Sequence, residues 1–397
     1  MTNQTPEELL KTAVKFHKKK NFTKAKYFYE KTIKINPNSI DAHNNLGIVL
    51  KELGLLYEAI NSFEHVLRIN SDNIYGHYNL GLVYKNLSNH KKAILCFSKV
   101  VQINPKHYSA FNNLGIVFKE IGDLNKAKKC YENVLKIKPD HLNAYHNLGN
   151  VLFVLREFEK AKNIYQNALK LNPNDKYLSH MISALTGKNE QNAPKEYVVN
   201  VFDNFANKFD NFLTKNLKYK VPEKLLKLLE RNFPDKKKFK NVIDLGCGTG
   251  LSGSVFRNIS EHLVGVDVSS KMIAKAQIKG IYDNIYHDDV VAYLGKYKKK
   301  FDLFIAADVF IYVGNLDKIF SIISSKSNSG ANFCFSVEKS NNEDFKLLKS
   351  ARYSHSKEYI KRLALKYNFS ICDYKETEIR FELNSSLTGY IYVLSKV

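Results

Sequence analysis

The sequence predicts a multidomain chain in which an all-α helical solenoid is followed by an α/β domain. Two observations carry this prediction. Leu-Gly pairs recur every 34 residues through the first half of the chain, and short apolar runs alternate with helical stretches in the second half. A length of 397 residues, 44% of them hydrophobic, allows two or three domains that each bury a core.

The first half repeats four features in phase: a Leu-Gly pair, an Ala, an aromatic residue four positions after the Ala, and a closing Pro. The Leu-Gly pairs begin at Leu46, Leu80, Leu114 and Leu148. In these features the first half resembles the tetratricopeptide (TPR) repeat, a pair of amphipathic helices, and five units fit residues 6–175. Because stacking of units supplies the core, residues 176–186 are expected to form a capping helix, so that the array occupies residues 1–186.

An Asn precedes each Leu-Gly pair. These residues are Asn45, Asn79, Asn113 and Asn147, and their spacing places them on the first helix of successive units, on the inner face of the superhelix. A carboxamide both donates and accepts hydrogen bonds, so such a ladder can hold an extended peptide backbone of any sequence. We therefore predict a groove for a protein or peptide partner. The simpler alternatives are that the Asn side chains satisfy backbone groups between helices or reflect composition.

A change of pattern marks the second domain. Residues 187–195 are polar and contain Gly and Pro, which predicts a linker. Residues 196–397 then alternate apolar runs with helical stretches, and this βαβ order implies a mostly parallel sheet with helices on both faces. Ligands of such sheets bind outside the carboxyl ends of the strands.

A strand followed by three spaced glycines carries the strongest site motif. The segment NVIDLGCGTG ends a buried strand at Asp244 and continues to Gly246, Gly248 and Gly250. Residues 248–253 also match the GxGxxG dinucleotide fingerprint, but that fingerprint should begin where the strand ends. Here an acidic residue and an earlier glycine come first. The whole pattern resembles the first motif of class I S-adenosylmethionine (SAM) methyltransferases, which have a Rossmann-like α/β fold.

This resemblance implies SAM as the cofactor and gives roles to the polar strand ends. Asp244 would meet the ammonium group of SAM, and the glycines would let the backbone lie close to it. Asp267, after the second strand, would accept hydrogen bonds from the ribose hydroxyls, as acidic residues do in NAD enzymes. The other cofactor candidates are Met272 on the adenine ring, Asp288 and the favoured Asp289 on the adenine amine, and Asp308 beside the methyl group. Singly, each carboxylate is also explained as a solvated strand end.

The remaining segments resemble bacterial predicted methyltransferases that carry TPR repeats. The likeness rests on residues 197–222, 335–338, 352–356, 380–382 and 389–391, and it implies a closing antiparallel strand pair near 369–378 and 389–396. A protonated acceptor would need a base, and the candidates are His355, Asp308, Tyr312 and Glu338. A packing role explains His355 equally well. Four aromatic residues either cover the cofactor or belong to the core: Phe202, Phe205, Phe209 and Tyr219.

The absence of two motifs limits the kinds of methyl acceptor that are expected. No Asn-Pro-Pro-aromatic sequence follows the fourth strand, which disfavours methylation of an exocyclic adenine nitrogen or a side-chain amide nitrogen. No Pro-Cys pair is present for attack on a pyrimidine ring. These absences leave an oxygen, nitrogen, sulfur or carbon nucleophile on a small molecule or a protein.

The net charge of +22 does not indicate a nucleic-acid partner. Only seven basic residues are Arg, which nucleic-acid readers use most, and the charge is spread over both halves of the chain. The densest clusters, Lys236–Lys238 with Lys240, and Lys298–Lys300, precede parallel strands and so lie at the amino edge of the sheet, opposite the predicted site. Nucleic acid is therefore not expected as a partner.

Cysteine usage and hydrophobicity give the remaining expectations. The five Cys are scattered without a CxxC pair, so neither a disulfide framework nor a metal site is expected. No signal pattern or 18-residue apolar stretch occurs, which predicts a cytoplasmic protein without a membrane span. Two functions follow: a SAM-dependent methyltransferase whose TPR groove binds a partner or substrate, or a non-catalytic TPR scaffold with a SAM-binding or degenerate methyltransferase domain.

Overall fold

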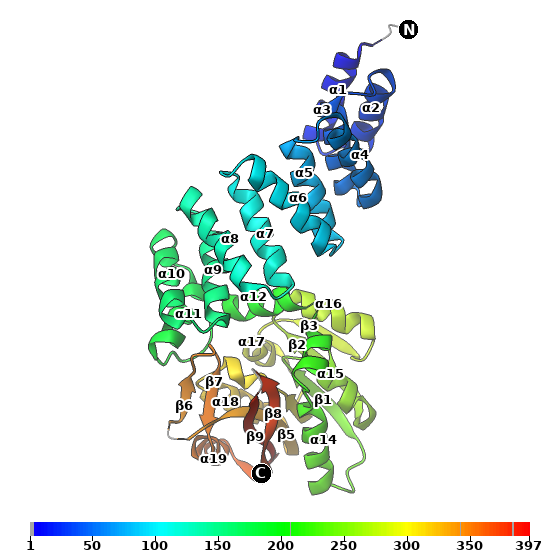
Figure 1. Ribbon diagram of the computed structural model, residues 1–397. Coiled ribbons are helices and arrows are strands. Elements are labelled where there is room, and N and C mark those ends of the chain that lie inside the picture. Colours follow the sequence, from blue (N-terminus) through cyan, green and yellow to red (C-terminus); the bar gives the residue numbers. More distant parts are fainter. Residues whose placement is uncertain (1–3, 207, 342, 383–384) are drawn as a thin grey trace. The chain divides into compact units, whose positions relative to one another are not determined.

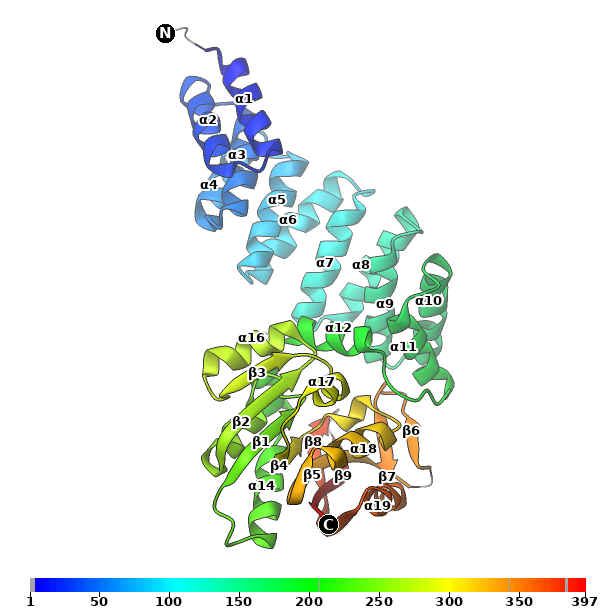
Figure 2. The same ribbon diagram turned by 180° about the vertical axis from the view of Figure 1, so that it is seen from behind.

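The chain divides into two compact units, Met1–Pro173 and Asn174–Val397. The computed structural model describes residues 4–206, 208–341, 343–382 and 385–397. Figure 1 shows the helical first unit and the α/β second unit, and Figure 2 shows both from behind. No helix among the described residues is long and apolar enough to span a membrane.

The first unit is built from five pairs of helices over its described residues, as the 34-residue period predicts. The first helices of the pairs are α1 (Pro6–Lys18), α3 (Ile40–Glu52), α5 (Ile74–Asn86), α7 (Tyr108–Glu120) and α9 (Leu142–Val154). The second helices are α2 (Phe22–Ile35), α4 (Leu56–Ile69), α6 (His90–Ile103), α8 (Leu124–Ile137) and α10 (Phe158–Leu171). The two helices of each pair pack together, and the second helix of every pair but the last packs on the first helix of the next pair. One continuous buried core runs from Ala13 to Cys130.

The repeated glycine and the repeated aromatic residue meet within one repeat. A Cβ atom on Gly47 would lie 2.6 Å from the ring of Phe63, and one on Gly149 would lie 2.3 Å from the ring of Tyr165. Both rings are fully buried. The aromatic side chain therefore fills the space left by the glycine of its own repeat, and the sequence pattern reflects this contact between paired helices.

The helices of the second unit flank a central sheet. They are α11 (Lys176–Thr186), α12 (Lys195–Phe205), α13 (Phe209–Asn211), α14 (Val221–Asn232), α15 (Leu251–Phe256), α16 (Ser270–Lys279), α17 (Val290–Lys296), α18 (Asp317–Ser325) and α19 (Lys357–Lys366). Short turns of π-helix (Phe212–Asn216) and 3-10 helix (Arg257–Ile259 and Phe310–Tyr312) complete the helical segments.

The sheet has nine strands in the part of the chain that the structure describes. They are β1 (Phe239–Leu245), β2 (Ser260–Asp267), β3 (Asn284–His287), β4 (Phe301–Ala306), β5 (Ser327–Ser340), β6 (Phe345–Leu347), β7 (Tyr353–Ser356), β8 (Phe369–Glu382) and β9 (Ser385–Lys396). The order is β3-β2-β1-β4-β5, all parallel, and β9 then pairs antiparallel with β5 and β8. The short β7 and β6 join the carboxyl end of β5. The predicted parallel sheet and closing strand pair are confirmed.

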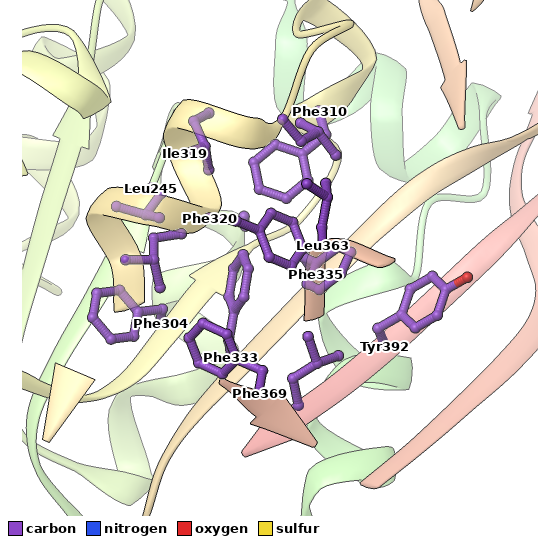
Figure 3. Packing of buried hydrophobic residues seen from close by; sticks show 14 of the residues in the cluster. Leu245, Phe304, Phe310, Ile319, Phe320, Phe333, Phe335, Leu363, Phe369 and Tyr392 are labelled. Carbon is purple, nitrogen blue, oxygen red and sulfur yellow. The ribbon is translucent and has the colours of Figure 1, made fainter. Parts of the chain in front are cut away.

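Alternate residues of the central strands face two separate helical layers. Phe304 and Phe333 belong to the core under α17, α18 and α19, whereas Leu303 and Cys334 belong to the core under α14 and α15. Figure 3 shows the first core, where rings from β4, β5 and α18 interdigitate. The strand order reverses between β1 and β4. Sheets of this kind bind their ligands at the carboxyl ends of the strands at such a point.

Residues between the repeats and the sheet belong to the second unit. In α11, expected to cap the repeats, His180 is buried and its Nε2 donates to the Ala351 carbonyl at 3.1 Å. The expected linker is also bonded along its length, since the Asn189 amide contacts β6 and the Ala193 N–H donates to the Tyr312 carbonyl at 3.0 Å. Tertiary hydrogen bonds thus hold a segment that its composition alone would leave loose.

Candidate active site

The loop between β1 and α15 is shaped by three glycines with positive φ angles. Gly246, Gly248 and Gly250 have φ of +68°, +53° and +90°, values that side chains with a Cβ avoid. A Cβ on Gly248 would meet only the Phe209 ring, at 3.9 Å, so that side of the loop is open. A Cβ on Gly246 would clash with Val309 at 2.8 Å. The loop thus lies against the end of β4 on one side and leaves space at Gly248.

Asp267 ties this loop to the end of β2. Its carboxylate accepts the Gly248 N–H and the Ser269 N–H, both at 2.8 Å, and only 7% of the residue is exposed. Burial raises the pKa of Asp267, while the hydrogen bonds from Ser269 and Gly248 oppose the rise. Each carboxylate oxygen has a second lone pair, so Asp267 can still accept from a ligand hydroxyl.

Asp244 is enclosed beneath the same loop. The Tyr282 hydroxyl donates to its carboxylate at 2.7 Å, and the residue is 1% exposed. Burial raises the pKa of Asp244 to about 7; the hydrogen bond from Tyr282 opposes this rise and the charge of Asp267 adds to it. Tyr282 lies across Gly253 and Gly265, where a Cβ would approach its ring within 2.4 and 3.1 Å. No motif of the sequence identifies Tyr282, and its only sequence signal is Gly253 and Gly265, where any side chain would meet its ring.

The residues predicted to contact the adenine ring of SAM follow β3 or belong to α16. The Asp288 N–H donates to the Asp267 carbonyl, and the Asp288 carboxylate pairs with Lys296 at 3.1 Å, which lowers the pKa of Asp288. The favoured Asp289 caps α17, since its Oδ1 accepts from the Val291 and Ala292 N–H groups. Met272 is fully buried in α16. These residues share the carboxyl edge of the sheet with Asp244 and Asp267.

Asp308 follows β4 and belongs to a buried ionic cluster. Its carboxylate accepts from Arg380 at 2.5 Å, and Arg380 also pairs with Glu338, which in turn lies 3.0 Å from the Arg352 Nε. Glu338 and Arg380 are each 2% exposed. The cluster joins residues from β5, β8 and the ends of β4 and β7. Arg380 appeared in the sequence only within a family likeness, without a role.

A β-bulge precedes Arg380 on β8. The pairing of β8 with β9 shifts register between Glu378 and Arg380, so Ile379 is an extra residue in its strand. Ile379 packs so tightly on β9 that a Cβ on Gly389 would lie 1.9 Å from its Cδ1 and 2.2 Å from the Val337 carbonyl. Bulges re-aim side chains, and this one accompanies the placement of Arg380 against Asp308.

Two catalytic candidates occupy different environments. His355, on β7, is fully buried, and its Nε2 donates to the Val313 and Gly314 carbonyls at 2.9 and 3.0 Å. Burial lowers the pKa of His355 to about 4, the opposite of what a base near neutral pH needs. Tyr312 is half-buried and its pKa is raised to about 12 by burial. Its ring contacts Phe202 of α12, with 5.3 Å between ring centroids.

Described residues of the segment that contains α12 and α13 are bonded to the glycine loop and to α16. Asp203 accepts from the Ser269 hydroxyl at 2.6 Å, and Asp210 accepts from the Thr249 hydroxyl and pairs with Lys279 at 2.7 Å. The Phe202, Phe205 and Phe209 rings contact one another on this segment and are half-buried, whereas Tyr219 belongs to the core. The hydrogen bonds of Asp203 and Asp210 therefore hold this segment against Ser269 and Thr249.

The asparagines of the repeats differ from one another. Asn113 is buried and bonded within the array, donating to the Tyr78 hydroxyl and accepting from Lys85 at 2.6 Å. Asn79 donates to Asn44 at 3.0 Å. For Asn45 and Asn147, both half-buried, no side-chain hydrogen bond occurs within the described part of the array. The four asparagines therefore occupy equivalent positions in the repeats but differ in their hydrogen bonds.

Family models match both halves of the chain. The tetratricopeptide repeat models match residues 28–61, 74–107, 108–141 and 142–175, and a methyltransferase domain model matches residues 217–372. No curated protein sequence matches significantly. Within the described residues, no group of three or more His, Cys, Asp or Glu side chains is placed to hold a metal ion.

Three solved structures that resemble the chain each correspond to less than half of it. A MamA protein is 24% identical, covering 42% of this chain and 92% of its own, with a TM-score of 0.40. YrrB, titled a TPR protein with an unusual peptide-binding site, is 24% identical over 44% of this chain and 89% of its own, with a TM-score of 0.39. PilF of Pseudomonas aeruginosa is 20% identical over 46% and 84%, with a TM-score of 0.41. From the family matches and the fold, the chain combines a tetratricopeptide repeat array with a Rossmann-like methyltransferase domain.

Proposed function

We propose that the second unit binds SAM and transfers its methyl group, and that the repeat array binds a protein or peptide partner. One observation carries the first part: the open, positive-φ glycine loop is held by the Asp267 carboxylate at the end of β2. A cofactor with a ribose and a cationic tail suits this arrangement. The loop lets a ligand approach the backbone, and the ionised carboxylates of Asp244 and Asp267 attract a positive charge.

The chain's own residues then have defined tasks. Asp267 accepts from ribose hydroxyls with its remaining lone pairs, and Asp244 faces the cationic tail directly or through water. Asp288 and Met272 line the adenine end. When bound, SAM supplies a methyl group on a sulfonium that is already activated, so the protein mainly orients the acceptor and excludes water. His355 holds the 313–314 backbone in this proposal and is not assigned as a base.

Replacing Gly248 with Ala should abolish SAM binding. The new methyl group would occupy the open side of the loop, where the nearest side-chain atom is 3.9 Å away, and so would take the space proposed for the cofactor. Gly330→Ala is the matched control, since Gly330 has φ of +68° with open space around it and lies on β5 toward the amino edge. Titration calorimetry with SAM should detect binding in wild type and in the control.

The two variants separate a blocked site from backbone strain. Both place a side chain at a positive φ, which costs about 1–2 kcal/mol. Equal loss of affinity in both would point to strain alone and remove the support for the loop as the cofactor site. Absence of binding in wild type would favour the non-catalytic scaffold.

The partner site of the repeat array rests on the half-buried Asn45 and Asn147. Their carboxamides form no side-chain hydrogen bond among the described residues, so they are able to bond a peptide backbone. Asn113 is engaged by Lys85 and Tyr78 and contributes less in this proposal.

Removing both carboxamides should reduce partner binding. The double variant Asn45→Ala/Asn147→Ala is expected to lose most of the protein recovered by affinity purification of the full chain, because each lost hydrogen bond costs about 0.5–1.5 kcal/mol. The control Asn61→Ala/Asn163→Ala changes exposed asparagines on the second helices, α4 and α10, of the same two repeats. Calorimetry should show unchanged SAM affinity in both. Equal partner recovery from the two double variants would contradict the ladder.

A further inference from the structure

Asp308 combines backbone strain with an unpartnered oxygen. Its φ is +63°, in the left-handed region that residues with a Cβ rarely adopt. Its carboxylate is 16% exposed: Oδ2 accepts from Arg380, whereas Oδ1 is buried and has no hydrogen-bond partner among the described residues. Backbone strain and a lone buried acceptor in one residue are features that functional sites retain.

Three contacts fix the direction of this carboxylate. The Asp308 N–H donates to the Ser336 hydroxyl at 2.8 Å, which holds the backbone in its strained conformation. Arg380 holds Oδ2 at 2.5 Å, and Glu338 holds Arg380 from its other side. Ser336, Glu338 and Arg380 are all buried, so the Asp308 carboxylate cannot turn without breaking a buried ion pair.

Among the described residues, the charges of the cluster that holds Asp308 are balanced. Two carboxylates, Asp308 and Glu338, alternate with two guanidinium groups, Arg380 and Arg352. The cluster therefore offers no excess positive charge to hold an anionic acceptor, while Oδ1 remains a hydrogen-bond acceptor with lone pairs to fill. A ligand group that donates a hydrogen bond suits this oxygen, whereas a second carboxylate there would be repelled.

Asp308 also adjoins the proposed cofactor loop. Its neighbour Val309 packs so closely on Gly246 that a Cβ there would lie 2.8 Å from Val309 Cγ2. The carboxylate therefore lies at the carboxyl edge between β1 and β4, where methyl transfer is proposed. This adjacency links the unpartnered oxygen to the reacting groups.

We infer that the methyl acceptor carries a hydrogen on a nucleophilic nitrogen or oxygen atom, as an amine or hydroxyl group does, and that Asp308 Oδ1 accepts this hydrogen. The inference rests on the proposed function and narrows its substrate class. In the step, the lone pair of the acceptor nitrogen or oxygen forms the new bond to the methyl carbon. The carbon–sulfur bond breaks with its electron pair going to sulfur, and the acceptor proton passes to Asp308.

The variant Asp308→Asn tests this role with little change of shape. Arg380 requires an oxygen, so the amide oxygen stays against Arg380 and the NH2 group takes the place of Oδ1, where it donates instead of accepting. Transfer of labelled methyl from SAM into an extract of cells lacking the chain should fall about 100-fold or more, with SAM affinity retained. Asp302→Asn is the control, because Asp302 accepts from Asn241 and Asn328 at the amino end of β4.

The chemical form of the product tests the acceptor class. Label transferred by wild type should survive mild base and be identified by mass spectrometry as N-methyl or O-methyl ether. Label released as methanol would reveal a carboxylate acceptor, and an S-methyl product a thiol; either overturns the inference and leaves the proposed methyl transfer standing. Parallel loss of SAM affinity in Asp308→Asn would assign Asp308 to the cofactor instead. Lack of any transfer by wild type overturns both proposals.

Discussion

Replacing Arg380 with Ala should destabilise the second unit by about 3–5 kcal/mol, the cost of removing one partner from a buried ion pair. Glu338, which is 2% exposed, would lose its ion pair with Arg380, and Asp308 would lose its contact at 2.5 Å. Folded domains are stable by only about 5–15 kcal/mol, so this single change should remove a large part of the stability of the unit.

The control is a second arginine with the same ion-pair distance at the surface. Arg362 lies 2.5 Å from Asp344, but the two side chains are 58% and 54% exposed. Water screens such pairs, so Arg362→Ala should cost no more than about 1 kcal/mol. Hydrogen exchange of the β5 and β9 amides at equilibrium gives the opening free energy of the second unit separately from the repeats. Similar losses of stability in the two variants would show that burial does not determine how strongly the Arg380 ion pairs stabilise the unit.

Replacing Asp244 with Asn should make the second unit more stable at pH 8 and remove a pH dependence of its stability. The folded pKa of Asp244, about 7, is raised above the unfolded value of about 3.9. A raised pKa gives stability that is fully present below the unfolded pKa and is lost as pH rises through the folded pKa. The loss between about pH 4 and pH 7 is on the order of 4 kcal/mol, from about three pKa units at about 1.36 kcal/mol each.

A nearby carboxyl with the opposite shift is the control for this experiment. Partial burial acts to raise the pKa of Asp283, but hydrogen bonds from Arg257 and the Leu263 N–H outweigh it, so the pKa is lowered overall. Asp283 therefore contributes stability that is present above its unfolded pKa, and Asp283→Asn should destabilise at pH 8. Urea unfolding at pH 5 and pH 8, followed by pulsed hydrogen exchange of β1 and β4, shows whether each variant is more or less stable than wild type at each pH. Equal pH slopes in wild type and Asp244→Asn would contradict the raised pKa.

Two buried carboxyl groups of the second unit, Glu338 and Asp244, have opposite effects on its stability. Glu338 is stabilised by the buried Arg380 and the partly exposed Arg352, whereas Asp244 destabilises the fold once it is ionised. A cationic ligand near Asp244 would favour its charged form. The proposed cofactor site therefore contains a carboxylate whose ionisation costs folding energy, which is a common property of binding sites.

Features encoded in short stretches of chain were predictable from the sequence. The 34-residue period gave the helix pairs, because each repeat packs on itself and its neighbours and so must carry the same marks. The glycine loop and Asp267 were also recognisable, since they lie at strand ends where the chain itself requires positive φ angles and polar residues.

The proposed acceptor side of the site depends on tertiary structure. Arg380 lies 72 residues from Asp308 and 42 from Glu338, and Tyr282 lies 38 residues from Asp244, so no local pattern joins them. The orientation of Arg380 accompanies a bulge at Ile379, and the low pKa of His355 follows from complete burial. The sequence by itself determined the repeats, the sheet and the glycine loop proposed to bind the cofactor, because their interactions are local or periodic. Only the packed sheet decided which charges meet, because ion pairing and burial depend on contacts between distant strands.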